Sequence, residues 1–328
     1  MKIFLTGGTG FLGNELLKEL HSKNHEITAL VRNPAKASFP PSVKLIPGSI
    51  EDLNSYRSVL QNQDVFVHVA ALVKMWVRDR KQFDRVNVEA TENVLRAAID
   101  SGVRKFIYAS SFMALGPSNG KPITENDARR ILDLHNDYER TKFLADQMMR
   151  GYIDRKYPVY ILYPGVIYGP GTLTDGNIVA KNLIPFLKGT MPFGLSIKDW
   201  CYSFVRDVVD GFVKIIESDP PSRRYILGGE NVSGETFYRK VQEVTGKKPP
   251  FLNIPMPMAI ASGYGEYLLA ELFGREPSLL THEVARIYKH SWSYDSSLAQ
   301  QEIGYRITPF VDGLRQMIEW LRSSGYIR

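Results

Sequence analysis

Short apolar runs alternate along the chain with stretches in which apolar residues recur every three or four positions. The apolar runs occupy residues 2–5, 27–31, 43–47, 65–69, 103–109, 159–162 and 225–227. Runs of this length predict buried strands, and the helical spacing between them, as at residues 87–99 and 135–157, predicts amphipathic helices. Strands that alternate with helices form a parallel sheet with right-handed crossovers and helices on both faces. The sequence therefore predicts an α/β fold built on a doubly wound parallel sheet.

The first predicted strand runs directly into a glycine-rich turn and then a helix. Glycine lets a backbone turn tightly, approach a phosphate closely and pack a helix against a strand. The helix N-terminus then offers free N–H groups and a positive dipole end to an anion. This order predicts the pyrophosphate corner of a Rossmann domain, so a dinucleotide is the expected ligand. The expected contacts are Gly7, Thr9, Gly10, Phe11, Leu12 and Gly13.

The end of the second predicted strand should lie beside the adenosine ribose of that nucleotide. An acidic residue there selects the free 2′-hydroxyl of NAD, but this chain has Arg32, and Glu26 stands at the other end of the strand. A guanidinium suits a 2′-phosphate, and Lys36 offers a second cation. The sequence favours NADP, with NAD as the alternative.

The pattern loosens after residues 169–171, Gly-Pro-Gly. Residues 249–277 are rich in Pro, Met, Tyr and Leu and show no strand alternation. We expect residues 1–170 to form the dinucleotide-binding domain, with residues 201–228 returning to it. Residues 171–200 and 229–328 are expected to form a smaller, mostly helical C-terminal substrate lobe.

Composition removes several other classes of protein. The 328 residues are 44% hydrophobic and 23% charged, and the net charge of +6 is scattered rather than clustered, so no nucleic-acid partner is expected. A single cysteine, Cys201, and no leader-like start fit a cytoplasmic protein. No window is long and uncharged enough to span a membrane. His282 and Glu283 begin like a zinc-protease helix, but Arg286 stands where its second histidine would be, so no metal is expected.

Tyr138 and Lys142 lie four residues apart on a predicted helix and therefore share one face. An ammonium beside a phenol favours the phenolate and lowers its pKa. Such a tyrosine can exchange a proton with an alcohol or carbonyl oxygen while a cofactor exchanges a hydride. The same spacing recurs at Tyr152 and Lys156, but that pair lies fourteen residues further on, about 21 Å from the strand ends at about 1.5 Å per residue. We expect Tyr138 to be the catalytic tyrosine.

The strand at residues 103–109 ends in Ser110 and Ser111, at the carboxyl edge of the sheet. A hydroxyl at this edge can donate to the substrate oxygen and hold it near the phenol. Adjacent strand-end residues point in opposite directions, so only one of the two serines can do so. From the residues alone, either serine is a candidate, and so is an ordinary turn role.

Together these features resemble the extended short-chain dehydrogenase/reductases over nearly the whole chain. Within them the chain is most similar to the dihydroflavonol-4-reductase-like group, in particular to plant farnesol dehydrogenases. Further matching stretches are His68-Val69-Ala70-Ala71, Asn87-Val88-Glu89-Ala90-Thr91, Ser110-Ser111-Phe112-Met113-Ala114-Leu115-Gly116, Tyr163-Pro164-Gly165-Val166 and Phe204-Val205-Arg206-Asp207-Val208.

The resemblance implies roles for individual residues. Ser111 would be the catalytic hydroxyl and Lys142 would also hold the nicotinamide ribose. Ser49 follows Gly48 where the family has aspartate, which weakens the adenine contact or moves it to Ile50. The farnesol enzymes use NAD despite an arginine in a comparable place, so Arg32 leaves the cofactor open. The remaining cofactor contacts implied are Ala70, Ala71, Tyr138, Tyr163, Pro164, Gly165 and Val166.

The expected function is hydride exchange between NADP(H) and a small apolar alcohol or carbonyl compound, with Trp76, Phe112 and Met113 in the substrate wall. A nucleotide-sugar epimerase that retains NAD is the alternative enzyme, since residues 182–186 resemble a uracil-holding segment. Against it, Cys201 stands where those enzymes place an arginine for the diphosphate. A non-catalytic cofactor sensor or scaffold is the third alternative, and a homodimer is a candidate assembly.

Overall fold

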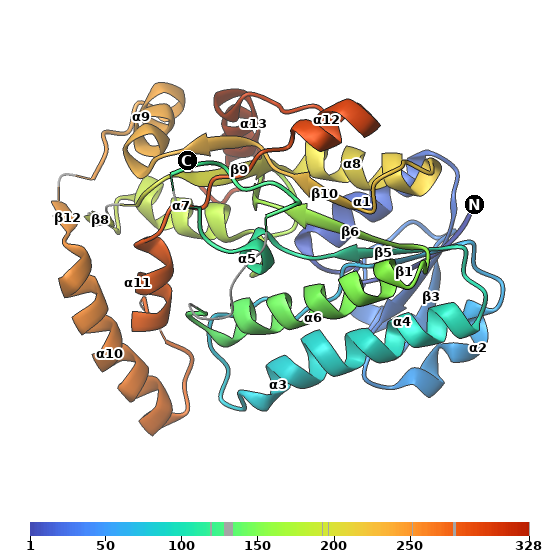
Figure 1. Ribbon diagram of the computed structural model, residues 1–328. Coiled ribbons are helices and arrows are strands. Elements are labelled where there is room, and N and C mark those ends of the chain that lie inside the picture. Colours follow the sequence, from blue (N-terminus) through green and yellow to red (C-terminus); the bar gives the residue numbers. More distant parts are fainter. Residues whose placement is uncertain are drawn as a thin grey trace.

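Seven parallel strands form the central sheet of the computed structural model, which describes residues 1–118, 120–127, 134–191, 193–195, 197–250, 252–277 and 280–327. Their spatial order is β10-β6-β5-β4-β1-β2-β3, so the chain starts in the middle and builds outward in two directions (Figure 1). Each predicted strand is present, and the α/β prediction is confirmed. The strands are β1 Lys2–Thr6, β2 Glu26–Val31, β3 Lys44–Pro47, β4 Val65–His68, β5 Lys105–Ala109, β6 Val159–Pro164 and β10 Arg224–Leu227.

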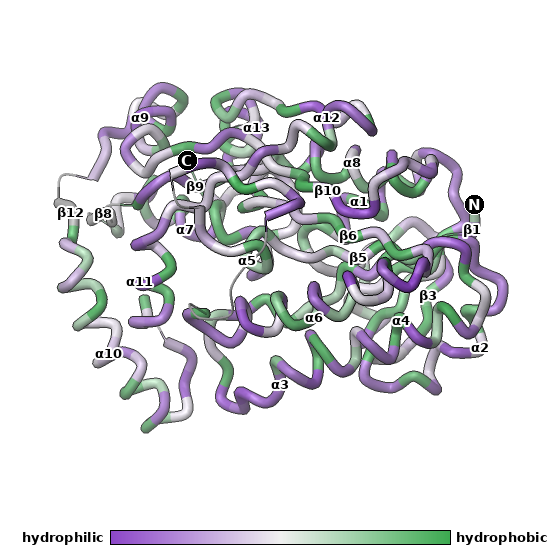
Figure 2. The backbone as a smooth tube through the Cα atoms, viewed as in Figure 1, coloured by the Kyte–Doolittle hydropathy of each residue, from purple (hydrophilic) through white to green (hydrophobic). Residues whose placement is uncertain are grey.

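Helices cover both faces of this sheet, as Figure 1 shows. On one face α1 (Phe11–Ser22) packs against α8 (Val205–Glu217). On the other face lie α4 (Ala90–Asp100) and α6 (Asp137–Asp154), which both contact the π-helical turn at Arg85–Glu89. Figure 2 shows the hydrophobic colour concentrated in the strands between these layers. Short helices complete this half of the chain: α2 Arg57–Leu60, α3 Lys81–Asp84, α5 Phe112–Leu115 and 3₁₀ turns at Pro34–Lys36 and Leu53–Ser55.

Beyond β6 the structure contains short strands that the sequence pattern did not predict. β7 (Val166–Tyr168), β9 (Trp200–Phe204) and β11 (Glu230–Val232) form a three-stranded sheet, and β8 (Phe193–Leu195) pairs with β12 (Leu252–Ile254). The expectation that residues 249–277 contain no strand is therefore wrong for β12. Four of these five strands have three residues each, too few to show alternation.

The C-terminal region is mostly helical, as predicted. Its helices α10 and α11 lie side by side at one edge of the molecule (Figure 1). None of the described helices is long and apolar enough to cross a bilayer. The helices of this region are α7 Ile178–Lys188, α9 Gly234–Thr245, α10 Met256–Phe273, α11 His282–Tyr288, α12 Ser297–Ile303 and α13 Phe310–Ser323.

Candidate active site

The glycine turn between β1 and α1 is built so that side chains would obstruct it. Gly7 has a φ of +80°, and a Cβ on it would lie 2.5 Å from the Ala70 backbone nitrogen. A Cβ on Gly13 would lie 2.2 Å from the Gly7 carbonyl oxygen, so α1 approaches the turn as closely as backbone permits. Gly10 caps α1 without a side-chain acceptor, which leaves the first amides of the helix without a side-chain cap. The cradle fits a pyrophosphate.

The loop after β4 forms the second wall of this cradle. Asn87 holds it, since its Oδ1 accepts from the Leu72 N–H at 2.8 Å and its Nδ2 donates to the Leu72 carbonyl. The same amide reaches Thr141 on α6 at 3.2 Å. Asn87 therefore ties the loop that carries Ala70 and Ala71 to the helix that carries Tyr138.

The adenosine end is more open. Arg32 directly follows β2 and is exposed, and it forms no hydrogen bond or ion pair within the described part of the chain. The Lys36 side chain lies outside the described atoms. Ile50 is buried, and its carbonyl accepts from the Tyr56 hydroxyl at 3.2 Å, while the Ser49 hydroxyl accepts from the Glu51 N–H at 3.3 Å. A guanidinium therefore stands free where the sequence places the ribose.

Ser111 and Tyr138 meet where β5 ends and α6 begins. Ser111 is the N-cap of α5, where its Oγ accepts from the Met113 N–H at 3.2 Å, and its hydroxyl lies close enough to Tyr138 to lower the pKa of the phenol. Asn136 caps α6 by accepting from the Glu139 N–H at 2.8 Å, which fixes Tyr138 in the first turn. The structure thus brings together the two hydroxyls that the sequence proposed.

Lys142 lies one turn further along α6 and is buried. Its Nζ donates to the Ala109 carbonyl at 2.8 Å and lies 3.4 Å from the Tyr108 hydroxyl. Burial lowers the pKa of Lys142 to about 7, although the nearby Asp146 opposes this shift. Burial raises the pKa of Tyr138 to about 12, and the Ser111 hydrogen bond lowers it by less. The expectation that Lys142 lowers the Tyr138 pKa is wrong, because burial dominates.

Buried polar side chains, among them His68 and Asp146, surround Lys142 in the core. His68 bridges Thr6 at 2.7 Å and Thr91 at 3.1 Å, and burial followed by the charge of Lys142 lowers its pKa to about 3. Asp146 is fully buried, and its Oδ2 accepts from Arg150 at 2.7 Å. With the His68 imidazole neutral and Asp146 paired with Arg150, Lys142 is the basic group beside the end of β5.

Ser110 differs from Ser111 in its surroundings. Its Oγ is buried and has no hydrogen-bond partner among the described atoms. A buried hydroxyl without a partner costs free energy unless a ligand or water satisfies it. The unpartnered Ser110 hydroxyl therefore fits a nucleotide bound at the strand ends.

The stretch that joins β6 to β7 packs closely against β9. The Tyr163 side chain is buried, and its hydroxyl lies 3.4 Å from Arg150. Gly165 donates its N–H to Ser203 at 3.0 Å, and a Cβ there would lie 2.6 Å from the Cys201 carbonyl. Pro164 ends β6 and Val166 begins β7. Gly165 therefore lets the backbone approach β9 closely, and the contact of residues 164–166 with a cofactor stays a prediction.

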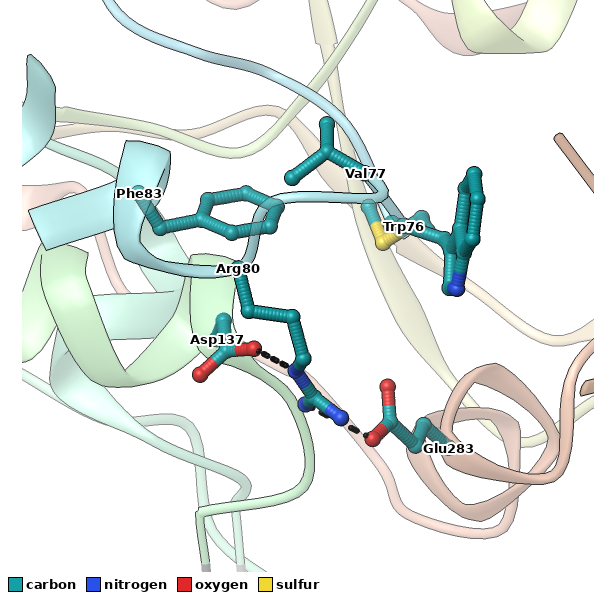
Figure 3. A pocket seen from close by; sticks show the side chains of 7 residues that line it. Trp76, Val77, Arg80, Phe83, Asp137 and Glu283 are labelled. Carbon is teal, nitrogen blue, oxygen red and sulfur yellow. Dashed lines mark hydrogen bonds and ion pairs between the residues drawn. The ribbon is translucent and has the colours of Figure 1, made fainter. Parts of the chain in front are cut away.

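The C-terminal lobe reaches the start of α6 through Arg80, which the sequence reasoning missed. Arg80 forms ion pairs with Asp137 on α6 and with Glu283 on α11, the latter at 3.0 Å, and it donates to the Tyr267 hydroxyl at 2.9 Å. Figure 3 shows its side chain reaching between the two carboxylates. The side chains around Arg80 leave no room there for a ligand. Arg80 therefore links α6 to α10 and α11.

The proposed substrate residues are all buried. Trp76 lies at the same hollow, and its indole N–H donates to Glu271 on α10 at 3.0 Å. Phe112 packs edge-on against Trp292 at 5.5 Å, in a cluster with Trp200 and Tyr294. Met113, like Phe112, belongs to the main hydrophobic core. Their contact with substrate stays a prediction. Among the described residues no cluster of His, Cys, Asp or Glu could hold a metal ion.

The profile of the NAD dependent epimerase/dehydratase family matches residues 3–228, which is more than half of the chain. The chain belongs to this family. Its members include the extended short-chain dehydrogenase/reductases, which the sequence resembles, and the chain is an enzyme of this NAD-dependent type. The narrower likeness to plant farnesol dehydrogenases stays a prediction.

Relatives of full length support the assignment. A Synechocystis sp. protein named a dihydroflavonol 4-reductase is 28% identical over 99% of this chain and 96% of its own. Sterol demethylase protein B of Methylococcus capsulatus is 26% identical, with both chains fully covered. The crystal structure of gox2253 superposes with a TM-score of 0.82 at 28% identity, covering 99% of each chain.

Asp146 and Arg150 in this family member were also missed, although a signal for them exists. Residues 138, 142, 146 and 150 follow one another at intervals of four, so they share one face of α6. The repeat predicts a charged column running from the catalytic end into the fold. No comparable signal marks Arg80, because its partners come from three distant elements.

Proposed function

We propose that this enzyme transfers a hydride between NADP(H) and an apolar alcohol or carbonyl compound. The pairing of Ser111 with Tyr138 at the end of β5, where the serine hydroxyl lowers the pKa of the phenol, carries the proposal. It lies on the same sheet edge as the glycine cradle, where nucleotides of such folds bind. The relatives named for dihydroflavonol and sterol chemistry support an apolar, ring-containing substrate.

The bound nicotinamide would supply or accept the hydride. Tyr138 would donate a proton to the carbonyl oxygen as that oxygen gains negative charge. A phenol whose pKa lies at about 12 stays protonated at neutral pH, which suits donation in the direction of reduction. Ser111 would hold the oxygen within reach, and Lys142 would hold the ribose while the Ala109 carbonyl keeps its ammonium in place.

Arg32 supports NADP over NAD. A charge-assisted hydrogen bond to a 2′-phosphate is worth roughly ten- to hundredfold in affinity. We expect Arg32→Ala to remove most of the preference for NADPH in a fluorescence titration and to leave NADH binding unchanged. Arg322→Ala, an exposed arginine on α13, is the matched control. Equal affinity of the unaltered protein for NADPH and NADH would contradict the proposal.

The function itself is tested by turnover. The purified protein is mixed with NADPH or NADH and with isoprenoid, flavonoid and steroid carbonyl compounds, and nicotinamide absorbance is followed. Oxidation of the cofactor by one of these classes, abolished in Tyr138→Phe, is the expected result. Turnover of nucleotide sugars with the cofactor returned unchanged would instead establish the epimerase alternative.

Cys201 argues against a nucleotide-sugar substrate. It lies in β9, fully buried, and burial raises the pKa of its thiol to about 11. A neutral thiol offers no charge to a diphosphate, and burying that anion without a cation is costly. The segment at residues 182–186 lies within α7 and is the one observation that favours the epimerase. The intact trio of Ser111, Tyr138 and Lys142 argues against a non-catalytic sensor or scaffold.

A further inference from the structure

Helix α10 packs with its small residues inward and its large apolar residues outward. Its buried positions are Ala259, Gly263 and Ala270, and a Cβ on Gly263 would lie 2.4 Å from the His282 nitrogen at the start of α11. In contrast, Leu272 is 69% exposed and Phe273 is 71% exposed. Burial of apolar area therefore explains the contact between α10 and α11 but leaves the larger side chains in solvent.

These outward residues form one continuous strip. At about 100° per residue, an arc of roughly 140° contains eight residues of α10, none of them charged and all of them exposed. Figure 2 shows hydrophobic colour along this helix at the edge of the molecule. We call this strip the outer face of α10; it consists of Met258, Ala261, Ser262, Gly265, Leu268, Leu269, Leu272 and Phe273.

Two arginines stand at the C-terminal end of the outer face. Arg275 follows the helix, and the Arg78 guanidinium carbon would lie 3.0 Å from a Cβ on Gly274. Both are exposed, and neither has an ion-pair partner within the described residues. The nearby carboxylates are engaged elsewhere, since Glu271 accepts from Trp76 and Glu276 pairs with Lys74. These guanidinium groups are free to bind phosphate.

We propose that the outer face of α10 binds the surface of an anionic membrane, with the helix lying along the surface. An uncharged apolar strip with cations at its end is the arrangement of interfacial helices. Eight residues are too few for a stable contact with a second copy, which takes roughly 20–30 residues on each side. The proposal does not depend on the reaction that the enzyme catalyses.

The test is flotation of the full chain with vesicles. Vesicles of phosphatidylcholine and phosphatidylglycerol in equal parts should bind the protein, and vesicles of phosphatidylcholine alone should bind it more weakly. The double variant Leu272→Glu, Phe273→Glu should bind at least about tenfold more weakly. The double variant Arg78→Gln, Arg275→Gln should lose the preference for the anionic lipid.

Leu144→Glu is the matched control, because Leu144 is an exposed leucine on α6, 38% accessible, away from α10. It should bind vesicles as the unaltered protein does, and circular dichroism verifies that every variant folds. No binding of the unaltered protein, or equal loss in Leu144→Glu, would overturn the proposal. A dimer in sedimentation that the Leu272→Glu, Phe273→Glu variant dissociates, without vesicle binding, would overturn it in favour of a second copy.

Discussion

The two ends of α6 carry the same pattern, a tyrosine followed four residues later by a lysine, in different surroundings. At the first end Tyr138 lies beside Ser111, whose hydroxyl lowers the pKa of the phenol, and Lys142 donates to the Ala109 carbonyl at the end of β5. At the second end the Tyr152 ring packs at a tilt against Tyr157, with ring centres 5.4 Å apart, and the Arg155 guanidinium lies 4.6 Å from its ring centre.

The lysines differ even more. Lys142 lies within the helix and faces the sheet, whereas α6 ends at Asp154 and Lys156 lies beyond it with a φ of 68°. The spacing places two side chains on one face only while the helix continues. A catalytic pair must also lie at the carboxyl edge of the sheet, and only the N-terminal end of α6 lies there. Spacing names candidates, and position in the fold selects between them.

The largest expected effect is the difference in kcat between variants of the two tyrosines of α6. Tyr138→Phe should lower kcat by at least about 10²- to 10⁴-fold, because it removes the proton donor, while cofactor binding persists. Tyr152→Phe should leave kcat nearly unchanged, since the ring contacts survive. Steady-state rates and a cofactor titration of both variants measure this. A similar loss in both would show that the two ends of α6 do not differ in function.

The two serines at the end of β5 test which hydroxyl acts with Tyr138 at the N-terminal end of α6. Ser111→Ala should lower kcat by roughly 10²-fold, because a donor aimed at developing charge acts in the transition state. Ser110→Ala should change stability or cofactor affinity by only about 1 kcal/mol, since its hydroxyl has no partner among the described atoms. Both are measured at saturating cofactor. A greater loss of kcat from Ser110→Ala would reassign the catalytic hydroxyl.

The fold was predictable where local pattern is strong. The seven strands of the main sheet coincide with short apolar runs that have helical spacing between them, so the runs locate each strand. β9 is equally buried but was missed as a strand, because its pairing with β7 and β11 joins segments far apart in the chain. Short strands that form through distant partners leave little local trace.

The site shows the same division. Sequence spacing identifies Gly7, Gly13, Tyr138 and Lys142, because one turn or one helix face determines their geometry. The electrostatics did not follow from spacing: burial, which depends on the whole fold, reverses the expected shift in the Tyr138 pKa. Arg80 depends on α6, α10 and α11 together and so could not be predicted from any one of them.

The lysines differ in their effect on stability against pH. Burial in the fold lowers the pKa of Lys142 to about 7, below its ordinary value of 10.5, so the unfolded chain binds more protons between these values. Its contribution to the free energy of unfolding therefore rises with pH from about 7 upward, by at most about 1.4 kcal/mol per pH unit. Lys142→Met should remove this slope in urea unfolding between about pH 7 and 8.5. Lys156→Met should keep it, and a slope lost equally in both would contradict the assignment.

The smallest effect concerns the second end alone. Lys156 adopts a left-handed backbone conformation just after α6, and its N–H donates to the Ile153 carbonyl at 2.8 Å. Glycine adopts this conformation without the steric cost of a Cβ, although it adds entropy to the unfolded chain. Lys156→Gly should therefore raise the free energy of unfolding by about 0.5 kcal/mol and leave kcat unchanged. Lys142→Gly at the first end would destabilise the helix by roughly 1 kcal/mol and abolish activity. A destabilised Lys156→Gly variant would mean that the Lys156 side chain contributes more than its exposed position indicates.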